Sequence, residues 1–247
     1  MAAAADTQKK KKNRAAIAVP AAPTPVPAAI SAPAPAAQII SAEAYFQLES
    51  TSKVRHEYRA GELVEMPGGT PNHNQITANL ISILIFALRR QPFRAFVADQ
   101  RLWIPEMDSY VYPDVMVTRD PLELLAGRRD TVLNPVLVAE VLSRSTGEYD
   151  RGEKFRSYRS IESLAEFLLI GQDAPFIEHY VKTENGWLLQ DVIGTEGKLA
   201  LASVPVELEL ADLFDKVAFH AADPEAIAAE PINDAVLGPE MPESEDA

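Results

Sequence analysis

An acidic residue stands inside each of two apolar segments of this chain, and these two acids constrain the fold more than any other feature. Asp114 lies in "VYPDVMV" at residues 111–117, and Glu140 lies in "LVAEVLS" at residues 137–143. Their β-branched residues predict buried strands, and a bare carboxylate in a core is costly unless it is paired, hydrogen-bonded or bound to a metal. Each acid therefore needs a partner from elsewhere in the chain.

The two acids also constrain each other. If both point to one place at about 4 Å, their repulsion is on the order of 4 kcal/mol at an effective dielectric constant near 20. Either one acid is then protonated or a cation lies between them. The alternative is a structural role, in which Arg101 or another neighbour neutralises each acid.

Composition limits the kinds of site that the chain can build. Its 247 residues, 47% of them hydrophobic, suffice for one folded domain with tails. The sequence contains no cysteine, which excludes disulfides, thiolate metal sites and cysteine nucleophiles. Any metal must be bound by Asp, Glu, His or backbone oxygen, which favours a hard cation.

Charge and proline content divide the chain into three parts. Residues 1–38 form a basic Ala/Pro-rich arm, and residues 221–247 form a proline-containing tail with eight acids and no Lys or Arg. Neither part can bury enough apolar surface to fold, so both are predicted to be disordered around a domain at residues 39–220. The net charge of −13 argues against nonspecific adhesion to nucleic acid, but it is compatible with a local basic groove. No apolar run is long enough to span a membrane, so a cytoplasmic protein is expected.

Periodicity predicts a domain of the α+β or mixed α/β class. A short helix is expected from Ser41. A long helix with apolar residues at 3.6-residue spacing is expected after "PGGTPNHN", with Arg89 and Arg90 at its end, and a third helix is expected over residues 148–160. A polar loop is expected over residues 128–134. Strands are predicted for the segments "HEYR", "ELVEM", "FRAFVAD", "RLWIPE", "VYPDVMV", "PVLVAEVLS", "EFLLIG", "FIEHYVKTE" and "WLLQDVIG". Together they indicate a central sheet with helices.

Other charged residues extend the candidate site. Lys154 and Tyr158 are four residues apart on the third predicted helix and share a face with Arg151, so this helix could return an ammonium group to the carboxylates. Glu57 in "HEYRAGE" and His73 at the start of the long helix could converge on the same place. Such a set around one hard cation suits the activation of water against a phosphodiester. The simpler alternative for each residue is an exposed or structural role.

Five segments in order resemble a known family. "HEYRAGELVEM", "NHNQI", "YPDVMV", "LVAEVLSRST" and "DRGEKFRSY" are similar to the Uma-type restriction endonucleases, a branch of the PD-(D/E)XK nuclease superfamily. The resemblance covers residues 41–216. It implies a restriction-endonuclease-like core, in which a central mixed β-sheet is flanked by helices, and a requirement for Mg²⁺ or Mn²⁺.

The resemblance also implies roles for individual residues. Asp114 matches the acid of the PD motif and Glu140 the second acid, both as metal ligands. Glu57 matches the early acid and is expected as a further ligand, and His73 matches the histidine that opens the helix. Lys154 matches the lysine that orients the attacking water or stabilises the charged transition state.

Two positions depart from the family patterns. In the simplest superfamily pattern the lysine stands two residues after the second acid, where this chain has Leu142. The assignment of Lys154 therefore relies on the branch in which the lysine lies on the next helix. Arg144 stands where the branch usually has proline, which would alter the loop or add a phosphate contact.

These observations predict a Mg²⁺-dependent DNA endonuclease that hydrolyses phosphodiester bonds by in-line attack on phosphorus. Nucleic acid is the expected partner, and cleavage of both strands of a duplex with one site per chain would suggest a homodimer. One alternative is a noncatalytic protein that keeps the nuclease fold and binds nucleic acid or another partner. A second is a glycosidase-like enzyme that uses the two carboxylates as acid and base, which an aromatic content of only 7% disfavours.

Overall fold

A computed structural model of the chain describes residues 39–66, 68–143 and 147–219. The arm predicted at residues 1–38 and the tail predicted at residues 221–247 lie outside these residues, and so does Arg144. Among the described residues, no helix is long and apolar enough to cross a membrane.

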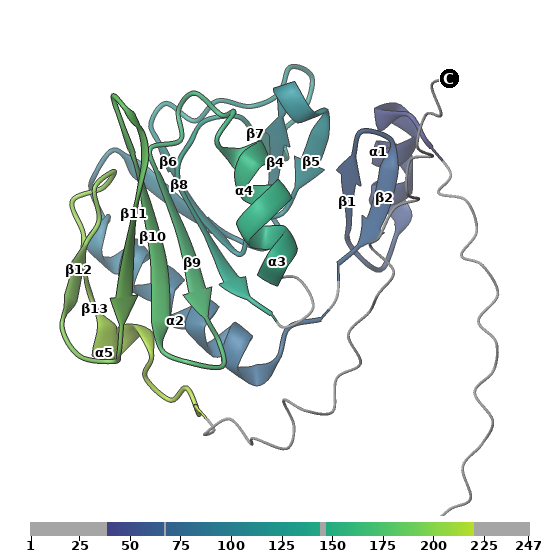
Figure 1. The fold of residues 1–247 in the computed structure, drawn as a ribbon. Coiled ribbons are helices and arrows are strands. Elements are labelled where there is room, and N and C mark those ends of the chain that lie inside the picture. Colours follow the sequence, from purple (N-terminus) through teal and green to yellow (C-terminus); the bar gives the residue numbers. More distant parts are fainter. Residues whose placement is uncertain (1–38, 67, 144–146, 220–247) are drawn as a thin grey trace, which may run out of the picture. The chain divides into compact units, whose positions relative to one another are not determined.

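A six-stranded mixed sheet forms the centre of the fold (Figure 1), with the strand order β11-β10-β9-β8-β6-β3. Its neighbouring strands are antiparallel except for β8 and β9, which are parallel. The strands are β3 (Phe93–Val97), β6 (Val115–Arg119), β8 (Pro135–Leu142), β9 (Glu166–Gly171), β10 (Phe176–Thr183) and β11 (Gly186–Ile193). The parallel pair β8–β9 is joined by the helical segment that carries Lys154, as a parallel connection requires.

A second sheet of five short strands carries the order β2-β1-β5-β4-β7. The strands are β1 (His56–Arg59), β2 (Glu62–Glu65), β4 (Arg101–Ile104), β5 (Ser109–Val111) and β7 (Thr131–Val132). The hairpin β1–β2 attaches through Tyr58 opposite Tyr110 and Arg59 opposite Ser109. A third, two-stranded sheet pairs β12 (Lys198–Ala200) with β13 (Glu207–Glu209).

Helices cover both faces of the six-stranded sheet. The long helix α2 (Pro71–Ala87) buries Ile76, Leu80 and Leu84 against one face, together with the short α5 (Leu210–Leu213). The other face packs against a helical segment composed of α3 (Gly147–Tyr149), the π-helical turn η2 (Asp150–Lys154) and α4 (Phe155–Tyr158). Helix α1 (Ala42–Thr51) packs on the second sheet, and η1 (Pro105–Met107) links β4 to β5. The architecture confirms the predicted fold class, a mixed sheet flanked by helices.

The starts of the first two predicted helices follow from their capping residues. The Ser41 side chain accepts a hydrogen bond from the Ala44 N–H, and the Thr70 side chain accepts one from the His73 N–H. Pro71 occupies the first turn of α2, where its missing N–H costs nothing. Helix α2 ends at Ala87, so Arg89 and Arg90 lie beyond it rather than in its last turn.

The prediction of one strand over "VYPDVMV" is wrong. Strand β5 ends at Val111, strand β6 begins at Val115, and the two strands belong to different sheets. Asp114 therefore lies in the crossing between the sheets. Pro113 suits this position because it lacks the N–H that a central strand would need.

Two further elements differ from prediction. The segment predicted as a polar loop over residues 128–134 contains β7, whose two residues are too short to produce an alternating pattern. The helix predicted over residues 148–160 runs from Gly147 to Tyr158 and contains the π-helical turn.

The burial of α2 predicts a contrast between two adjacent residues. Leu84 is fully buried, whereas the Ile85 side chain beside it is 57% exposed. We expect Leu84→Ala to lower the free energy of unfolding by about 2–5 kcal/mol, and Ile85→Ala to change it by less than about 0.5 kcal/mol. Denaturant unfolding of both variants measures the difference, and equal losses would contradict this placement of the helix.

Candidate active site

One pocket of about 760 Å³ gathers all five residues that the sequence singled out: Glu57, His73, Asp114, Glu140 and Lys154. These residues come from five separate segments, namely β1, α2, the crossing between sheets, β8 and η2. The pocket lies where the end of the six-stranded sheet meets the hairpin β1–β2 and the first turn of α2. The fold brings these five side chains together, and their catalytic and metal-binding roles are predictions from the sequence.

Asp114 is held by two donors. The register of β6 on β8 sets Val115 opposite Ala139, and the Val141 N–H donates to Asp114 Oδ2 at 2.7 Å. His73 Nε2 donates to the same oxygen at 3.1 Å. Burial alone would raise the pKa of Asp114, but these donors outweigh it and hold the pKa below its usual value. The partner that this acid needed is therefore His73 together with a backbone amide.

His73 connects α2 to the site. It stands in the first turn of the helix, where Thr70 caps its N–H at 3.1 Å. Burial opposes its charged form, but the contact with Asp114 raises the pKa of the imidazole above the usual value. The other ring nitrogen, Nδ1, is buried and has no hydrogen-bond partner among the described residues.

Glu140 lies on the face of β8 that packs against α4, because Val138 and Leu142 on either side of it belong to that core. Its Oε1 accepts a hydrogen bond from the Tyr158 hydroxyl at 2.6 Å and lies 2.9 Å from Lys154 Nζ. Burial raises the pKa of Glu140 to about 8, although Lys154 opposes this shift. The negative charge of Asp114 contributes to the same increase in the pKa of Glu140.

Lys154 is a buried cation among acids. Its Nζ lies 2.9 Å from Glu140, 3.7 Å from Glu57 and 3.7 Å from Asp150. Burial opposes its charge, but these carboxylates raise the pKa of Lys154 well above the usual value. The ammonium is therefore charged at neutral pH.

The prediction that Lys154, Tyr158 and Arg151 share one helical face is correct only for Lys154 and Tyr158. Arg151 Nε binds Glu178 at 2.6 Å, and its side chain is 42% exposed. The π-helical turn has more residues per turn than an α-helix, so spacing counted on a regular α-helix fails there.

Glu57 enters the pocket from β1. Its Oε2 accepts a hydrogen bond from Arg59 Nη2 at 2.5 Å, and its Oε1 lies 3.7 Å from Lys154. The guanidinium of Arg59 also lies 4.0 Å from the centre of the Tyr149 ring. Glu57 therefore couples the hairpin to the helical segment on the other side of the pocket.

The carboxylates fit a divalent cation of the Mg²⁺ type. Asp114 Oδ1 and Glu140 Oε2 accept no hydrogen bond from any described residue, while the second oxygen of each acid is occupied. Nowhere in the described parts of the chain do three or more His, Asp or Glu side chains form a group that could hold a metal ion. Mg²⁺ usually binds one or two carboxylates and completes its shell with water and substrate phosphate. Asp114 and Glu140 therefore suit such an ion better than one whose coordination shell must come entirely from protein ligands.

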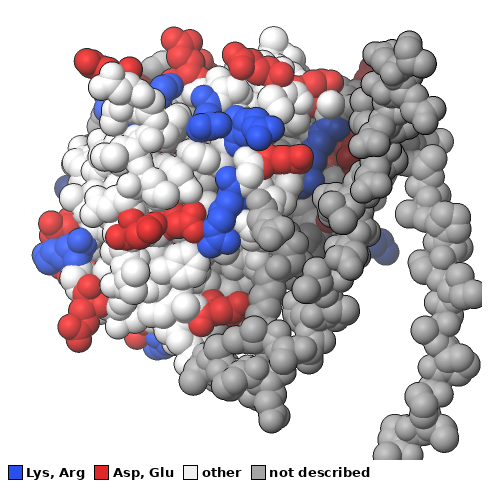
Figure 2. Space-filling model, viewed as in Figure 1, with Lys and Arg blue, Asp and Glu red and all other residues white. Residues whose placement is uncertain are grey.

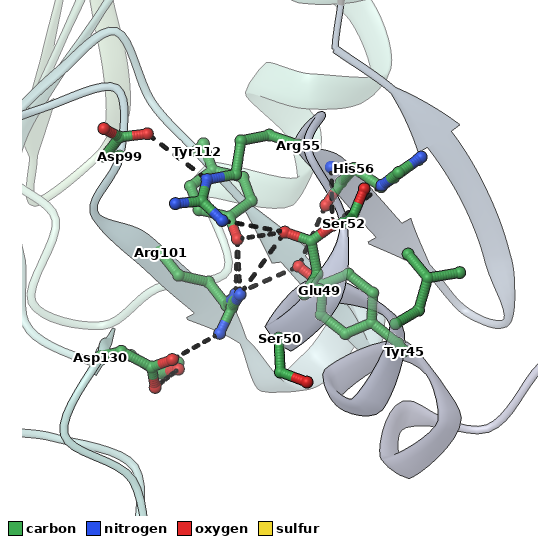
Figure 3. Close-up of polar contacts among 12 residues, drawn as sticks. Tyr45, Glu49, Ser50, Ser52, Arg55, His56, Asp99, Arg101, Tyr112 and Asp130 are labelled. Atoms are coloured by element: carbon green, nitrogen blue, oxygen red, sulfur yellow. Dashed lines mark hydrogen bonds and ion pairs between the residues drawn. The ribbon is translucent and has the colours of Figure 1, made fainter.

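A buried polar network fixes the strand that leads to Asp114 (Figure 3). The Tyr112 hydroxyl accepts hydrogen bonds from Arg101 Nη2 at 2.5 Å and Nε at 3.0 Å, and donates to Glu49 Oε2 at 2.9 Å. Arg101 also donates to Asp130 Oδ2 at 2.9 Å. Arg101 therefore does not neutralise Asp114 or Glu140, as the structural alternative proposed. It holds Tyr112, which lines the pocket.

The sequence assigns no role to three residues in or beside the pocket. Tyr158, a core residue that binds Glu140, gave one signal, its position four residues after Lys154. Asp150, also four residues from Lys154, carried the same signal and was missed. Arg59 gave none, because its contacts with Glu57 and Tyr149 depend on how the hairpin meets the helical segment.

Solved structures give the class of fold. The crystal structure of "a putative nuclease belonging to DUF820" from Anabaena variabilis ATCC 29413 is similar, with a TM-score of 0.56 at 17% sequence identity. The similarity covers 68% of this chain and 93% of that chain. The fold is therefore shared with a nuclease-like protein.

Sequence comparison gives the family. Residues 42–213 match the model of the Uma2 family, described as "Putative restriction endonuclease", and the chain belongs to this family. Two proteins of Synechocystis sp. (strain ATCC 27184 / PCC 6803 / Kazusa) are similar along most of their length. The protein sll1609 is 36% identical over 170 residues, which are 68% of this chain and 96% of the relative. The protein slr1290 is 33% identical over 183 residues, which are 73% of this chain and 94% of the relative.

The raised pKa of Glu140 predicts an unusual pH dependence of stability. Between the usual pKa near 4.5 and about 8, the folded protein retains a proton on Glu140 that the unfolded chain has released. The contribution of this group to stability is therefore present at low pH and lost as the pH rises through about 8. The glutamine in Glu140→Gln does not titrate. We therefore expect the free energy of unfolding of the variant, relative to that of the original protein, to increase from about pH 5.5 to about pH 8, by on the order of 1 kcal/mol per pH unit. Urea unfolding at both pH values measures this change, and parallel pH profiles would contradict it.

Proposed function

We propose that the protein is a divalent-metal-dependent phosphodiesterase that acts on nucleic acid, specifically a DNA endonuclease. The observation that carries this proposal is the arrangement of Asp114, Glu140 and Lys154 in one pocket. Two acidic side chains, each with one oxygen that accepts no hydrogen bond from a described residue, line the same pocket as a buried ammonium group. Family membership supports the same activity.

Mg²⁺ or Mn²⁺ is the proposed cofactor, with Asp114 and Glu140 as its protein ligands. When bound, such an ion supplies Lewis-acid chemistry to a phosphoryl group and to water. Binding would displace the proton that burial places on Glu140. Glu57, predicted as a further ligand, is proposed here as one too. Its hydrogen bond from Arg59 and its distance of 3.7 Å from Lys154 Nζ also suit a second role, in which it positions the lysine.

Each remaining residue has a role that follows from its contacts. Lys154 presents a fixed positive charge to the pocket and would stabilise the negative charge that develops on phosphate oxygens during in-line attack. His73 holds Asp114 through Nε2, which fixes one carboxylate oxygen and leaves the other for the ion. Tyr158 does the same for Glu140 through its hydroxyl. The ligands would therefore be oriented before substrate binds.

DNA is the proposed substrate and the cytoplasm the proposed location, in keeping with a restriction-endonuclease-like family. The five candidate residues of one chain meet in one pocket. Cleavage of both strands of a duplex would then need two chains, and we propose a homodimer for that case.

The proposal predicts a specific loss of activity. Asp114→Asn removes a carboxylate charge while it keeps the acceptor for His73 and the Val141 N–H. We expect Mg²⁺- or Mn²⁺-dependent cleavage of plasmid DNA to fall by about a hundredfold or more, because the ion loses one of its two protein ligands. Gel electrophoresis of nicked and linear products measures the rate.

Asp191→Asn is the matched control, because Asp191 is an exposed acid on β11 outside the pocket. It should cleave like the original protein. Thermal melting of both variants tests whether they are folded. Cleavage by folded Asp114→Asn at the original rate would overturn the proposal, and cleavage that persists in chelator would favour metal-independent carboxylate chemistry.

A further inference from the structure

A second hollow adjoins the candidate active site. It has a volume of about 240 Å³ and shares Arg59 and Tyr149 with the larger pocket as lining residues. The Arg59 guanidinium lies 4.0 Å from the centre of the Tyr149 ring, so this pair forms the wall between the two spaces. The two spaces are therefore adjacent, with Arg59 and Tyr149 facing both of them.

Arg156 distinguishes the second hollow from the first. The cations of the catalytic pocket are committed, since Lys154 faces three carboxylates and Arg59 binds Glu57. The exposed Arg156 lines the second hollow and has no hydrogen bond or ion pair with any described residue. Its guanidinium is therefore available to a ligand.

The other polar groups of the hollow do not compete with Arg156. The Ser157 hydroxyl donates to the Glu153 carbonyl at 2.9 Å, and the Ser109 hydroxyl donates to the Met107 carbonyl at 2.8 Å. The carboxylate of Glu153 also lines the hollow, but it makes no ion pair with Arg156. The hollow is thus lined by one cation that has no described partner, by the Glu153 carboxylate and by the Tyr149 ring.

The surrounding surface is rich in cations. In the view of Figure 2, Lys and Arg side chains gather over the region that α4 occupies in Figure 1. For a protein with a net charge of −13, such a local concentration is where an anionic strand can approach.

We infer that the second hollow is a subsite for nucleic acid, in which Arg156 binds the backbone phosphate next to the one being cleaved. The inference rests on the proposed function and extends it to the path of the strand. Lys154 and Arg156 are two residues apart on one helical segment, and the first faces the catalytic pocket while the second faces the hollow. Successive phosphates of one strand would meet these two cations in turn. Arginine beside an aromatic ring is a typical surface for single-stranded nucleic acid.

Arg156→Ala tests the subsite, with Arg159→Ala as the matched control. Arg159 is exposed, follows directly after α4 and lines neither space, and both substitutions remove one positive charge. The probe is a fluorescein-labelled single-stranded DNA of about 20 nucleotides. Its binding is followed by anisotropy in chelator, so that cleavage does not occur, over a range of about 50–200 mM salt.

We expect Arg156→Ala to weaken binding by on the order of tenfold at low salt, and to reduce the slope of log affinity against log salt by about 0.7, the value for one phosphate contact on a single strand. Arg159→Ala should leave the slope unchanged. Equal effects of the two variants, no effect of either, or no binding by the original protein would overturn the subsite.

Metal-dependent cleavage of plasmid DNA by the original protein, the assay of the proposed function, separates this inference from that function. If the protein cleaves but Arg156→Ala behaves like Arg159→Ala, the subsite is wrong and the nuclease assignment stands. If only Arg156→Ala reduces the salt slope but the original protein does not cleave, the subsite is supported and the nuclease assignment is wrong. The protein would then be a noncatalytic protein that binds nucleic acid.

Discussion

The contact between Lys154 and its three carboxylates is the interaction on which the rest of the structure depends. Glu140 comes from the central sheet, Glu57 from the hairpin β1–β2 and Asp150 from the π-helical turn, so one ammonium group joins three elements. A buried charge without a partner is strongly destabilising, by about 3–5 kcal/mol when one member of a buried pair is removed. Without Lys154, three acids would face one another in a space that water reaches poorly. The lysine therefore fixes both the position of the hairpin and the shape of the pocket.

The arrangement explains how the protein tolerates two acids in apolar surroundings when no cation is bound. Asp114 is stabilised as a carboxylate by His73 and the Val141 N–H, whereas burial favours the protonated form of Glu140. The sequence left two solutions open, a protonated acid or a cation between the acids, and burial favours the first of them at Glu140. Like charges near each other separate their pKa values, which is common at sites that perform chemistry. In the proposed site, a divalent ion would bind both acids and displace the proton of the neutral one.

Much of this site was predictable from the sequence, because an acid inside a β-branched segment is an exception that demands a partner. The capping residues Ser41 and Thr70 and the spacing of α2 likewise determine local structure. The break at Tyr112–Asp114 was not predictable, since whether a chain continues in one sheet or crosses to another depends on tertiary packing. The π-helical turn also escaped prediction, and with it the outward direction of Arg151. Residues such as Arg59 act through elements far apart in sequence, which a periodic pattern cannot reveal.

Calorimetric titration with Mn²⁺ near neutral pH tests the central claim most directly, because it detects the metal site without a known substrate. The protein should be compared with the double variant Asp114→Asn plus Glu140→Gln, after thermal melting has shown that the variant folds. The account predicts one binding event in the original protein, with release of a proton seen as a dependence of the heat on the buffer, and no binding in the folded variant. Equal binding by the two proteins would contradict it, and Asp114 and Glu140 would then be structural charges within a nuclease-like fold.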